Sequence, residues 1–199
     1  MYNSRRYLTE RRLNSIIEQF LSVSSLPDVG SLIEIGVGSG LLGYLLRNGD
    51  FYYRSLDISL TLKPDVVGDV CNLPFESGSF DAVACFQVLE HLEFEQSVKA
   101  IEEMYRVAKK YLILSLPIKG IYWTYSIYIP TVGLKKFVIK RPFQRMKSHI
   151  FDGEHLWELG SKQVLLNDFI DYLHSNYGGV RHWHCHGNPY HYFIVIQKS

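Results

Sequence analysis

A glycine-rich turn is the first place in the chain where residue types and spacing could do chemistry. Glu34 ends an apolar segment, and Gly36, Gly38 and Gly40 follow before a short apolar helix pattern begins. Glycines between a buried strand and a helix let backbone N–H groups approach a ligand, because no side chain stands in the way. Gly38, Gly40 and Gly43 also have the G-x-G-x-x-G spacing of dinucleotide sites. The turn therefore predicts a nucleotide-like ligand without deciding which one.

Two aspartates after the turn extend this hypothesis. Asp57 lies seventeen residues after Gly40, at the end of the predicted strand FYYRSLDIS. A carboxylate there can accept both hydrogen bonds of a ribose diol, a role shared by NAD and adenosylmethionine sites. Asp69 follows in the run Gly68-Asp69-Val70, ahead of the segment NLPF. These two aspartates alone do not distinguish an NAD site from an adenosylmethionine site. The surrounding motifs are needed for that distinction.

The elements that must position these residues alternate between strand and helix. Apolar strand patterns occur at 31–36, 51–59, 65–70, 80–88 and 111–117, with helix patterns at 41–49 and 98–110. The alternation predicts an α/β fold with a parallel, doubly wound, Rossmann-like sheet. The last two patterns, 178–186 and 191–198, indicate an antiparallel strand pair joined by a turn.

Five motifs together resemble the class I S-adenosylmethionine-dependent methyltransferases, in particular the small-molecule enzymes similar to ubiquinone and menaquinone methyltransferases. These motifs span residues 31–117 and read EIGVGSG, LDIS, GDVCNLPF, FDAVACFQVLEHL and EEMYRVAKKYLILSLP. The resemblance implies S-adenosyl-L-methionine as the cofactor. It also implies a seven-stranded sheet of order 3-2-1-4-5-7-6, with strand 7 antiparallel.

The resemblance also assigns roles to individual residues. It implies that Glu34 and the three glycines at 36, 38 and 40 surround the methionine moiety, and that Asp57 holds the ribose. Asp69 would face the adenine amine, with Ile58 and Val70 lining the ring. Phe86 and Gln87 would close the pocket beneath the sulfonium. These positions agree with the rule that ligands of open α/β sheets bind beyond the carboxyl ends of the strands.

We expect a single methyltransferase domain over 1–199, because 199 residues is an ordinary domain length. Its parts are an N-terminal helix (1–25), the cofactor-binding half (31–117), a basic aromatic insertion or lid (118–150), and an acceptor-side helix with the terminal strand pair (151–199). In the first part Leu13, Ile16, Ile17, Phe20 and Leu21 recur at helical spacing. The later helix is expected from Ser161 to His174.

His91 is a candidate general base, since it follows the fourth strand on the side where an acceptor would lie. A loop-capping or passive binding role is an equally good interpretation. Gln87, Glu90 and His91 also resemble the E-x-x-E-H run with which small-RNA 2′-O-methyltransferases bind magnesium. The amide of Gln87 replaces one of the carboxylates that a hard cation prefers, so we assign no metal site.

The insertion 118–150 contains no acidic residue and alternates basic with aromatic side chains. Three interpretations stay open: a lid over the acceptor, a peripheral contact with a membrane or lipid, and a nucleic-acid surface. We favour the lid and disfavour nucleic acid. Beyond the insertion, His182, His184 and His186 alternate along a predicted strand, which is compatible with metal ligation but equally with simple packing of Trp183 and Cys185.

A second segment after the insertion, GEHLWELG (153–160), resembles an acceptor-side segment of some uncharacterised methyltransferases. His155 within it could face the active site. An equally good interpretation is that His155 and Trp157 simply pack ahead of the following helix.

The composition supports a soluble enzyme and names no partner. Hydrophobic residues make up 47% of the chain, charged residues 21%, and the net charge is +1. Three widely spaced cysteines and the absence of a run of about 18 apolar residues lead us to expect a cytoplasmic protein.

The sequence thus predicts methyl transfer to an unidentified small-molecule acceptor, anionic or lipid-linked in character. A non-catalytic adenosylmethionine-binding or scaffold protein remains an alternative, because it would show the same motifs. An RNA 2′-O-methyltransferase and an NAD-dependent oxidoreductase are less favoured. Against the oxidoreductase stand Glu34, the GDVCNLPF motif and the lack of a separate substrate domain.

Overall fold

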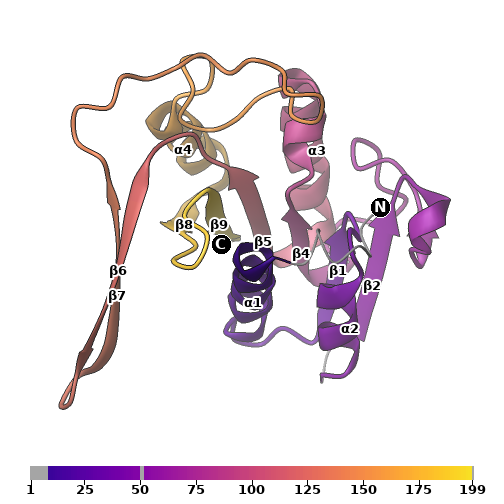
Figure 1. The fold of residues 1–199 in the computed structure, drawn as a ribbon. Helices are drawn as coiled ribbons and strands as arrows, with labels where there is room; N and C mark the ends of the chain where they lie inside the picture. Colours follow the sequence, from indigo (N-terminus) through magenta and orange to yellow (C-terminus); the bar gives the residue numbers. More distant parts are fainter. Residues whose placement is uncertain (1–8, 50–51, 199) are drawn as a thin grey trace.

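The computed structural model describes residues 9–49 and 52–198, and a mixed sheet forms its centre (Figure 1). The strands of this sheet are β1 (Ser31–Ile35), β2 (Tyr52–Asp57), β3 (Val66–Val67), β4 (Phe80–Phe86), β5 (Ala108–Pro117), β8 (Gly179–His184) and β9 (His191–Gln197). A separate hairpin consists of β6 (Tyr122–Ile129) and β7 (Gly133–Lys140). The helices are α1 (Glu10–Ser24), α2 (Leu41–Arg47), α3 (Phe94–Val107) and α4 (Leu166–Tyr177), with short turns η1 (Leu60–Leu62) and η2 (Leu89–His91).

The strand order within the described residues is β3-β2-β1-β4-β5-β9-β8. β1 to β5 pair in parallel, whereas β9 is antiparallel to both β5 and β8. Because β6 and β7 lie outside this sheet, β8 and β9 are its sixth and seventh strands along the chain. The predicted α/β fold and its order 3-2-1-4-5-7-6 are therefore confirmed.

Helices cover both faces of the sheet, which explains why its central strands are apolar almost throughout. α3 and α4 pack on one face through residues that include Met104 and Leu173. α1 and α2 pack on the other face through Val23 and Leu46. The buried strands leave their carboxyl ends as the part of the sheet that is open to a ligand.

The packed face of α1 differs from the predicted one. Ile16, Phe20 and Val23 contact the core, whereas Ile17 and Leu21 remain 53% and 49% exposed. The apolar stripe of α1 is thus wider than the part of the helix that packs against the sheet. Residues 1–8 of the expected N-terminal helix lie outside the described residues.

Two other boundaries and one element also differ from the sequence-based expectation. α3 ends at Val107, because residues 108–110 already belong to β5. α4 begins at Leu166 rather than Ser161, and the β6–β7 hairpin was not expected in the insertion. None of the described helices is long and apolar enough to cross a bilayer.

A buried carboxyl group joins β1, β2 and α2. Glu34 is only 4% exposed, and the Tyr53 hydroxyl donates a hydrogen bond to its Oε2. Gly43 of α2 makes room for the pair, since a Cβ at that position would lie 2.6 Å from the Tyr53 hydroxyl oxygen. Burial raises the pKa of Glu34 to about 8, although the Tyr53 hydrogen bond lowers it in part. The carboxyl therefore keeps its proton over a pH range in which the unfolded chain loses it.

We expect Glu34→Gln to flatten the pH dependence of stability. Because the folded-state pKa exceeds the ordinary value of 4.5, the folded protein binds more protons than the unfolded chain between pH 4.5 and about 8. The free energy of unfolding therefore falls as the pH rises through this range. One such group contributes at most about 1.4 kcal/mol per pH unit, and the variant lacks that contribution. Urea unfolding across this range measures the slope.

Glu103→Gln is the matched control for this measurement. Hydrogen bonding from Arg106 lowers the pKa of Glu103, so its effect on stability is confined to pH values below 4.5. That variant should keep the wild-type slope. Burial also raises the pKa of Glu90 to about 8, so Glu34→Gln should retain part of the fall. A Glu34→Gln protein with the full wild-type slope would show that Glu34 is already ionised in the folded state.

Candidate functional site

The carboxyl ends of the parallel strands meet at one edge of the sheet. Ile35 pairs with Leu56 of β2 and with Cys85 of β4, and Asp57 pairs with Val67 of β3. The backbone N–H of the glycine at 36 donates to the Leu56 carbonyl oxygen over 2.8 Å. The glycine turn and Asp57 therefore lie side by side, as expected for a ligand at the switch point of the sheet.

Gly36 and Gly38 shape the turn in different ways. Gly36 has φ of 86°, and a Cβ there would lie 2.3 Å from Cγ2 of Val88, in the segment that follows β4. A glycine is therefore needed both for the backbone conformation and for the close approach of this segment. Gly38 has φ of 52°, but among the described residues no atom apart from those of its chain neighbours lies within 4 Å of its Cβ position. Its side of the turn is open to a ligand.

The Asp57 carboxylate holds the turn in place. Its Oδ2 accepts a hydrogen bond from the Val37 N–H over 2.9 Å, and its Oδ1 accepts one from the Ser59 N–H over 2.8 Å. Each carboxylate oxygen has a second lone pair, so Asp57 can still accept hydrogen bonds from a ribose diol. Asp57 thus has a positioning role that the sequence did not reveal, beside the ligand-binding role that it predicted.

The residues expected around the adenine differ in their exposure to solvent. Asp69 is exposed, and its Oδ1 accepts a hydrogen bond from the Cys71 N–H over 2.9 Å. Ile58 is 78% exposed and can cover a ring, whereas Val70 is 7% exposed and packs in the core. A contact from Val70 to the adenine would therefore have to come from its backbone.

Phe86 packs in the core, whereas Gln87 lies at the candidate site. The Phe86 ring packs against Phe193 with 6.0 Å between the centroids. Gln87 adopts a φ of 56°, which is rare for a residue with a side chain, and its Nε2 donates to the Ser115 hydroxyl over 3.1 Å. Strained backbone of this kind is found most often at functional sites.

Gln87 lines a cavity of about 420 Å³ beyond the ends of β4 and β5. The lining side chains come from α1, the end of β5, the segment before α4 and the β8–β9 turn. They are Arg12, Gln87, Pro117, Ile118, Lys119, Gly120, His155, Glu158, Tyr190 and His191. The cavity thus lies at the same edge of the sheet as the glycine turn and has room for a small molecule.

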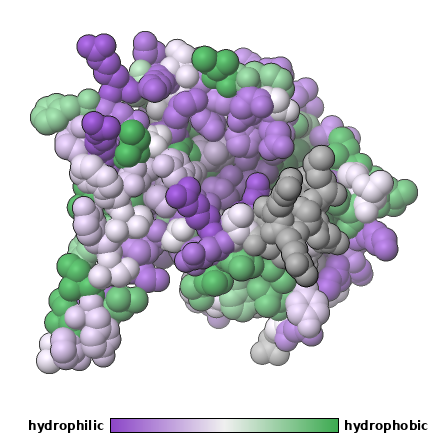
Figure 2. All heavy atoms as spheres, viewed as in Figure 1, coloured by the Kyte–Doolittle hydropathy of each residue, from purple (hydrophilic) through white to green (hydrophobic). Residues whose placement is uncertain are grey.

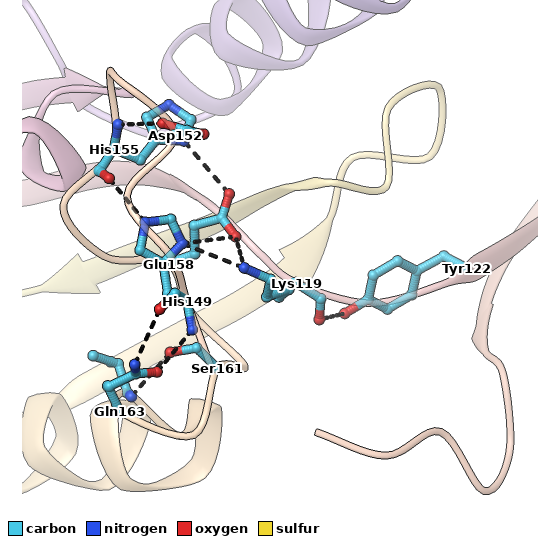
Figure 3. A network of polar contacts seen from close by, with 9 residues as sticks. Lys119, Tyr122, His149, Asp152, His155, Glu158, Ser161 and Gln163 are labelled. Atoms are coloured by element: carbon cyan, nitrogen blue, oxygen red, sulfur yellow. Dashed lines mark hydrogen bonds and ion pairs between the residues drawn. The ribbon is translucent and has the colours of Figure 1, made fainter. Parts of the chain in front are cut away.

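A polar network centred on Glu158 forms one wall of the cavity (Figure 3). Lys119 Nζ lies 3.1 Å and His149 Nδ1 3.4 Å from Glu158 Oε2, and His155 Nδ1 lies 3.4 Å from Oε1. The hydrogen bond from His155 lowers the pKa of Glu158 to about 2, with a further contribution from Lys119. The same hydrogen bond raises the pKa of His155. The wall therefore presents an ionised carboxylate held between cationic and imidazole groups.

His191 contributes a buried imidazole to this cavity. Its Nδ1 is buried without a hydrogen-bond partner among the described residues. Burial lowers the pKa of His191 to about 4, so the ring is neutral at neutral pH. An unpaired buried polar atom costs free energy, and a polar molecule in the cavity would supply the missing partner. The sequence offered no signal for His191, because only the tertiary fold brings it to the end of β5.

His91, the predicted general base, is exposed and lies outside the lining of this cavity. Its Nδ1 lies 2.8 Å from the Glu154 carbonyl oxygen, and its ring centroid is 5.3 Å from that of His155. Its catalytic role stays a prediction. His155, which sequence analysis left between packing and the active site, does line the cavity.

Glu90 is a candidate metal ligand next to His91 and His155. Both of its carboxyl oxygens are buried without a hydrogen-bond partner in the described part of the chain, and burial raises its pKa to about 8. Ligand atoms of Glu90, His91 and His155 all lie within 4.8 Å of one another. One carboxylate and two imidazoles are a donor set that fits a divalent transition metal. Sequence analysis had assigned no metal here.

The three alternating histidines have separate partners. His182 Nδ1 contacts the Tyr192 hydroxyl, and His184 Nδ1 lies 2.8 Å from the Pro189 carbonyl oxygen. His186 lies beyond the end of β8, where its Nε2 is 3.0 Å from the Tyr125 carbonyl oxygen. The groups of metal-type ligands in the described residues do not include them.

The insertion 118–150 contributes its first residues to the cavity lining and His149 to the polar network around Glu158. Ile118, Lys119 and Gly120 line the cavity, whereas hairpin residues such as Thr124 and Ser126 line a different cleft beside α1. Most of the insertion forms the β6–β7 hairpin, which is organised by backbone pairing along its whole length. Its role as a lid stays a prediction.

Comparisons with known proteins agree with the fold. Residues 33–114 match the family model of a methyltransferase domain. The uncharacterised protein MJ0638 of Methanocaldococcus jannaschii is 29% identical over 123 residues, which are 54% of this chain and 52% of that protein. The chain thus matches about half the length of this curated relative.

Two solved structures resemble the whole described fold. The PH0226 protein from Pyrococcus horikoshii OT3 has a TM-score of 0.60 at 17% identity, covering 100% of this chain and 93% of that one. The small RNA methyltransferase HEN1 has a TM-score of 0.63 at 15% identity, covering 100% of this chain and 26% of that one. The family-model match and the confirmed strand order lead to one conclusion: residues 33–114 are similar to a methyltransferase domain, and the chain has the fold of the class I S-adenosylmethionine-dependent methyltransferases.

Proposed function

We propose that the protein transfers a methyl group from S-adenosylmethionine to a small-molecule acceptor bound in the 420 Å³ cavity. The observation that carries this proposal is the position of the cavity at Gln87, directly after β4. The glycine turn and Asp57 lie at the ends of the neighbouring strands β1 and β2. A cofactor held there would have its sulfonium near the mouth of the cavity. Transfer then needs mainly in-line placement of the two reactants.

The lining of the cavity favours a polar acceptor with acidic character. Arg12 and Lys119 provide cationic side chains, and Glu158 offsets part of their charge. His191 is a neutral imidazole whose Nδ1 has no hydrogen-bond partner among the described residues, so it can hydrogen-bond an acceptor. Its lowered pKa disfavours a role as a base at neutral pH. His91 remains the candidate base. The protein supplies orientation and a partly water-excluded surface, and the cofactor supplies the electrophilic methyl group.

Gly38→Ala should abolish binding of S-adenosylhomocysteine. The added methyl group points into the open side of the turn, where we place the ligand. An alanine with positive φ also costs about 1–2 kcal/mol of stability. Isothermal titration calorimetry measures the binding, and thermal unfolding measures the stability. Binding of NAD by the wild-type protein, without a response to S-adenosylhomocysteine, would overturn the proposed cofactor.

Gly78→Ala is the matched control. Gly78 has φ of 68° and no protein atom within 4 Å of its Cβ position, so the backbone strain is of the same kind. Gly78 lies in the loop before β4, at the amino end of the strand, away from the glycine turn. This variant should lose similar stability and keep full affinity. Equal loss of affinity in both variants would show that Gly38 acts through stability alone.

Catalysis itself is tested with methyl-labelled S-adenosylmethionine and a fractionated small-molecule extract. We expect label to appear in a low-molecular-mass fraction with the wild-type protein and to be lost with Gly38→Ala. Tight S-adenosylhomocysteine binding without transfer to any fraction would favour the alternative, a non-catalytic binding or scaffold protein.

A second candidate function, metal-assisted methylation of an RNA 2′-hydroxyl, is favoured by Glu90. Its unpartnered carboxyl lies next to His91 and His155, and the fold resembles that of the small RNA methyltransferase HEN1. Two imidazoles favour Mn²⁺ or a similar ion over Mg²⁺. A bound cation would lower the pKa of a coordinated hydroxyl. The amide of Gln87, in place of a carboxylate, weighs against this function.

We expect Mn²⁺ to bind the wild-type protein and to bind at least tenfold more weakly to Glu90→Gln, because the amide is a poor substitute for a charged ligand. Calorimetry with MnCl₂ measures this directly, without a methyl acceptor. Glu95→Gln, which changes an exposed residue of α3, should bind the ion as the wild type does. Identical Mn²⁺ titrations of Glu90→Gln and wild type would remove the metal site and with it this second function.

A further inference from the structure

The β6–β7 hairpin projects from the body of the protein as a two-stranded arm (Figure 1). Its strands pair from Tyr122 and Lys140 at the base to Ile129 and Gly133 near the tip. One face of the arm is anchored: Tyr122 is 9% exposed, Val138 packs against the core, and the Tyr125 carbonyl oxygen lies 3.0 Å from His186 Nε2. The other face of the arm is open to surroundings other than the core.

The two faces of the arm differ in chemistry. Side chains alternate along strands, and directly paired residues share a face. One face carries Trp123, Tyr125, Ile127, Ile129, Phe137 and Ile139, all 39–53% exposed. The opposite face includes Thr124, Ser126 and Lys136, which line a cleft with α1. It also carries Lys140 at the base and the exposed pair Tyr128 and Leu134 near the tip. The apolar face thus points away from the protein, and hydrophobic side chains are visible along the arm in Figure 2.

Positive charge surrounds this apolar face. Segment 118–150 has no acidic residue, and six of its basic side chains are exposed: Lys135, Lys136, Lys140, Arg141, Arg145 and Lys147. The apolar exposure continues past the hairpin, since Phe143 is fully exposed and Ile150 is 81% exposed. A surface that combines exposed aromatic and aliphatic side chains with unopposed lysines and arginines complements a lipid interface that is negatively charged.

We propose that the β6–β7 arm docks the protein on an anionic membrane surface, with the face of Trp123, Tyr125 and Phe137 toward the lipid. Aromatic side chains are favoured at the headgroup level, and lysines can reach the phosphates. The open edges of the hairpin carry unpaired backbone groups, which keep it out of the hydrocarbon. The arm lies in the interface and does not span the bilayer. This docking is independent of methyl transfer.

A second copy of the chain is a poorer partner for the same face. Pairing two arms through this face would bring Lys135, which shares the face with Ile127, against the same residue of the other copy, and would bring the positive charge of both arms close together. The arm contains no acidic residue to offset this charge, so the contact would be repulsive. Negative lipid headgroups instead attract the lysines of the arm, and this attraction contributes to binding.

Sedimentation with vesicles tests the proposal on the whole protein. We expect binding to vesicles of equal phosphatidylcholine and phosphatidylglycerol, little binding to phosphatidylcholine alone, and weaker binding in high salt. Lys135→Ser, Lys136→Ser and Lys140→Ser together should lower the partition coefficient about a hundredfold, since each basic residue near such a surface contributes a factor of about five. Lys99→Ser, Lys109→Ser and Arg181→Ser, a charge-matched control on exposed residues elsewhere, should have little effect.

The apolar face is tested without a change of charge. Tyr125→Ser with Phe137→Ser removes one cross-strand aromatic pair and should also abolish sedimentation. Tyr44→Ser with Tyr52→Ser, which removes two exposed tyrosines at the other end of the sheet, should not. Circular dichroism confirms that each variant is folded. A vesicle-induced blue shift of tryptophan fluorescence that disappears in Trp123→Phe would place the arm itself in the lipid.

Three results would overturn the proposal. The first is no sedimentation with either vesicle, and the second is equal sedimentation of arm variants and their controls. The third is a different occupant of the face. A concentration-dependent dimer in sedimentation velocity that is lost in Tyr125→Ser with Phe137→Ser would assign the face to a second copy. Binding of a single-stranded RNA oligonucleotide that depends on the three lysines, without vesicle binding, would assign it to nucleic acid.

Discussion

The close packing of the glycine turn against the strand ends is the constraint on which the rest of the site depends. Gly36 has no room for a Cβ beside Val88, and the Asp57 carboxylate holds the turn through the Val37 N–H. These two contacts fix where β1 gives way to α2 and where the segment after β4 passes. Gln87 takes its strained conformation within that passage, at the lip of the cavity. The glycine turn and the cavity are therefore coupled through a few backbone positions.

A second constraint is electrostatic and lies on the acceptor side. Glu158 is ionised because His155 and Lys119 surround it, whereas Glu90 and His191 are neutralised by burial. The segment before α4 has no regular secondary structure over most of its length, so these polar contacts replace strand or helix pairing in holding it. The cavity wall consequently combines charged and neutral groups within one small volume. Such an arrangement suits recognition of a polar molecule rather than of an apolar chain.

The strand order of residues 31–117 and the position of the glycine turn could be predicted from the sequence because their determinants are local, whereas the roles of these residues toward the cofactor stay predictions. Glycines at fixed spacing and an aspartate at a strand end predict the same local structure wherever the strand lies in the sheet. Contacts that depend on tertiary packing could not be predicted in this way: Val70 and Phe86 turned out to face the core, and His191 reached the cavity from the far end of the chain. The β6–β7 hairpin was missed although Trp123, Tyr125 and Ile127 alternate with Thr124 and Ser126, because segment 118–150 was interpreted from its basic and aromatic composition rather than from this period of two. Its pairing is visible only once both strands are placed.

The most direct test of this account is a crystal structure of the protein with S-adenosylhomocysteine. The account predicts that the ribose hydroxyls donate to Asp57, that the amino acid moiety lies against the glycine turn at Gly38, and that the sulfur faces the cavity at Gln87. A ligand bound elsewhere, or bound at the turn with its sulfur directed away from Gln87, would contradict the assignment of cofactor site and acceptor cavity to one reaction.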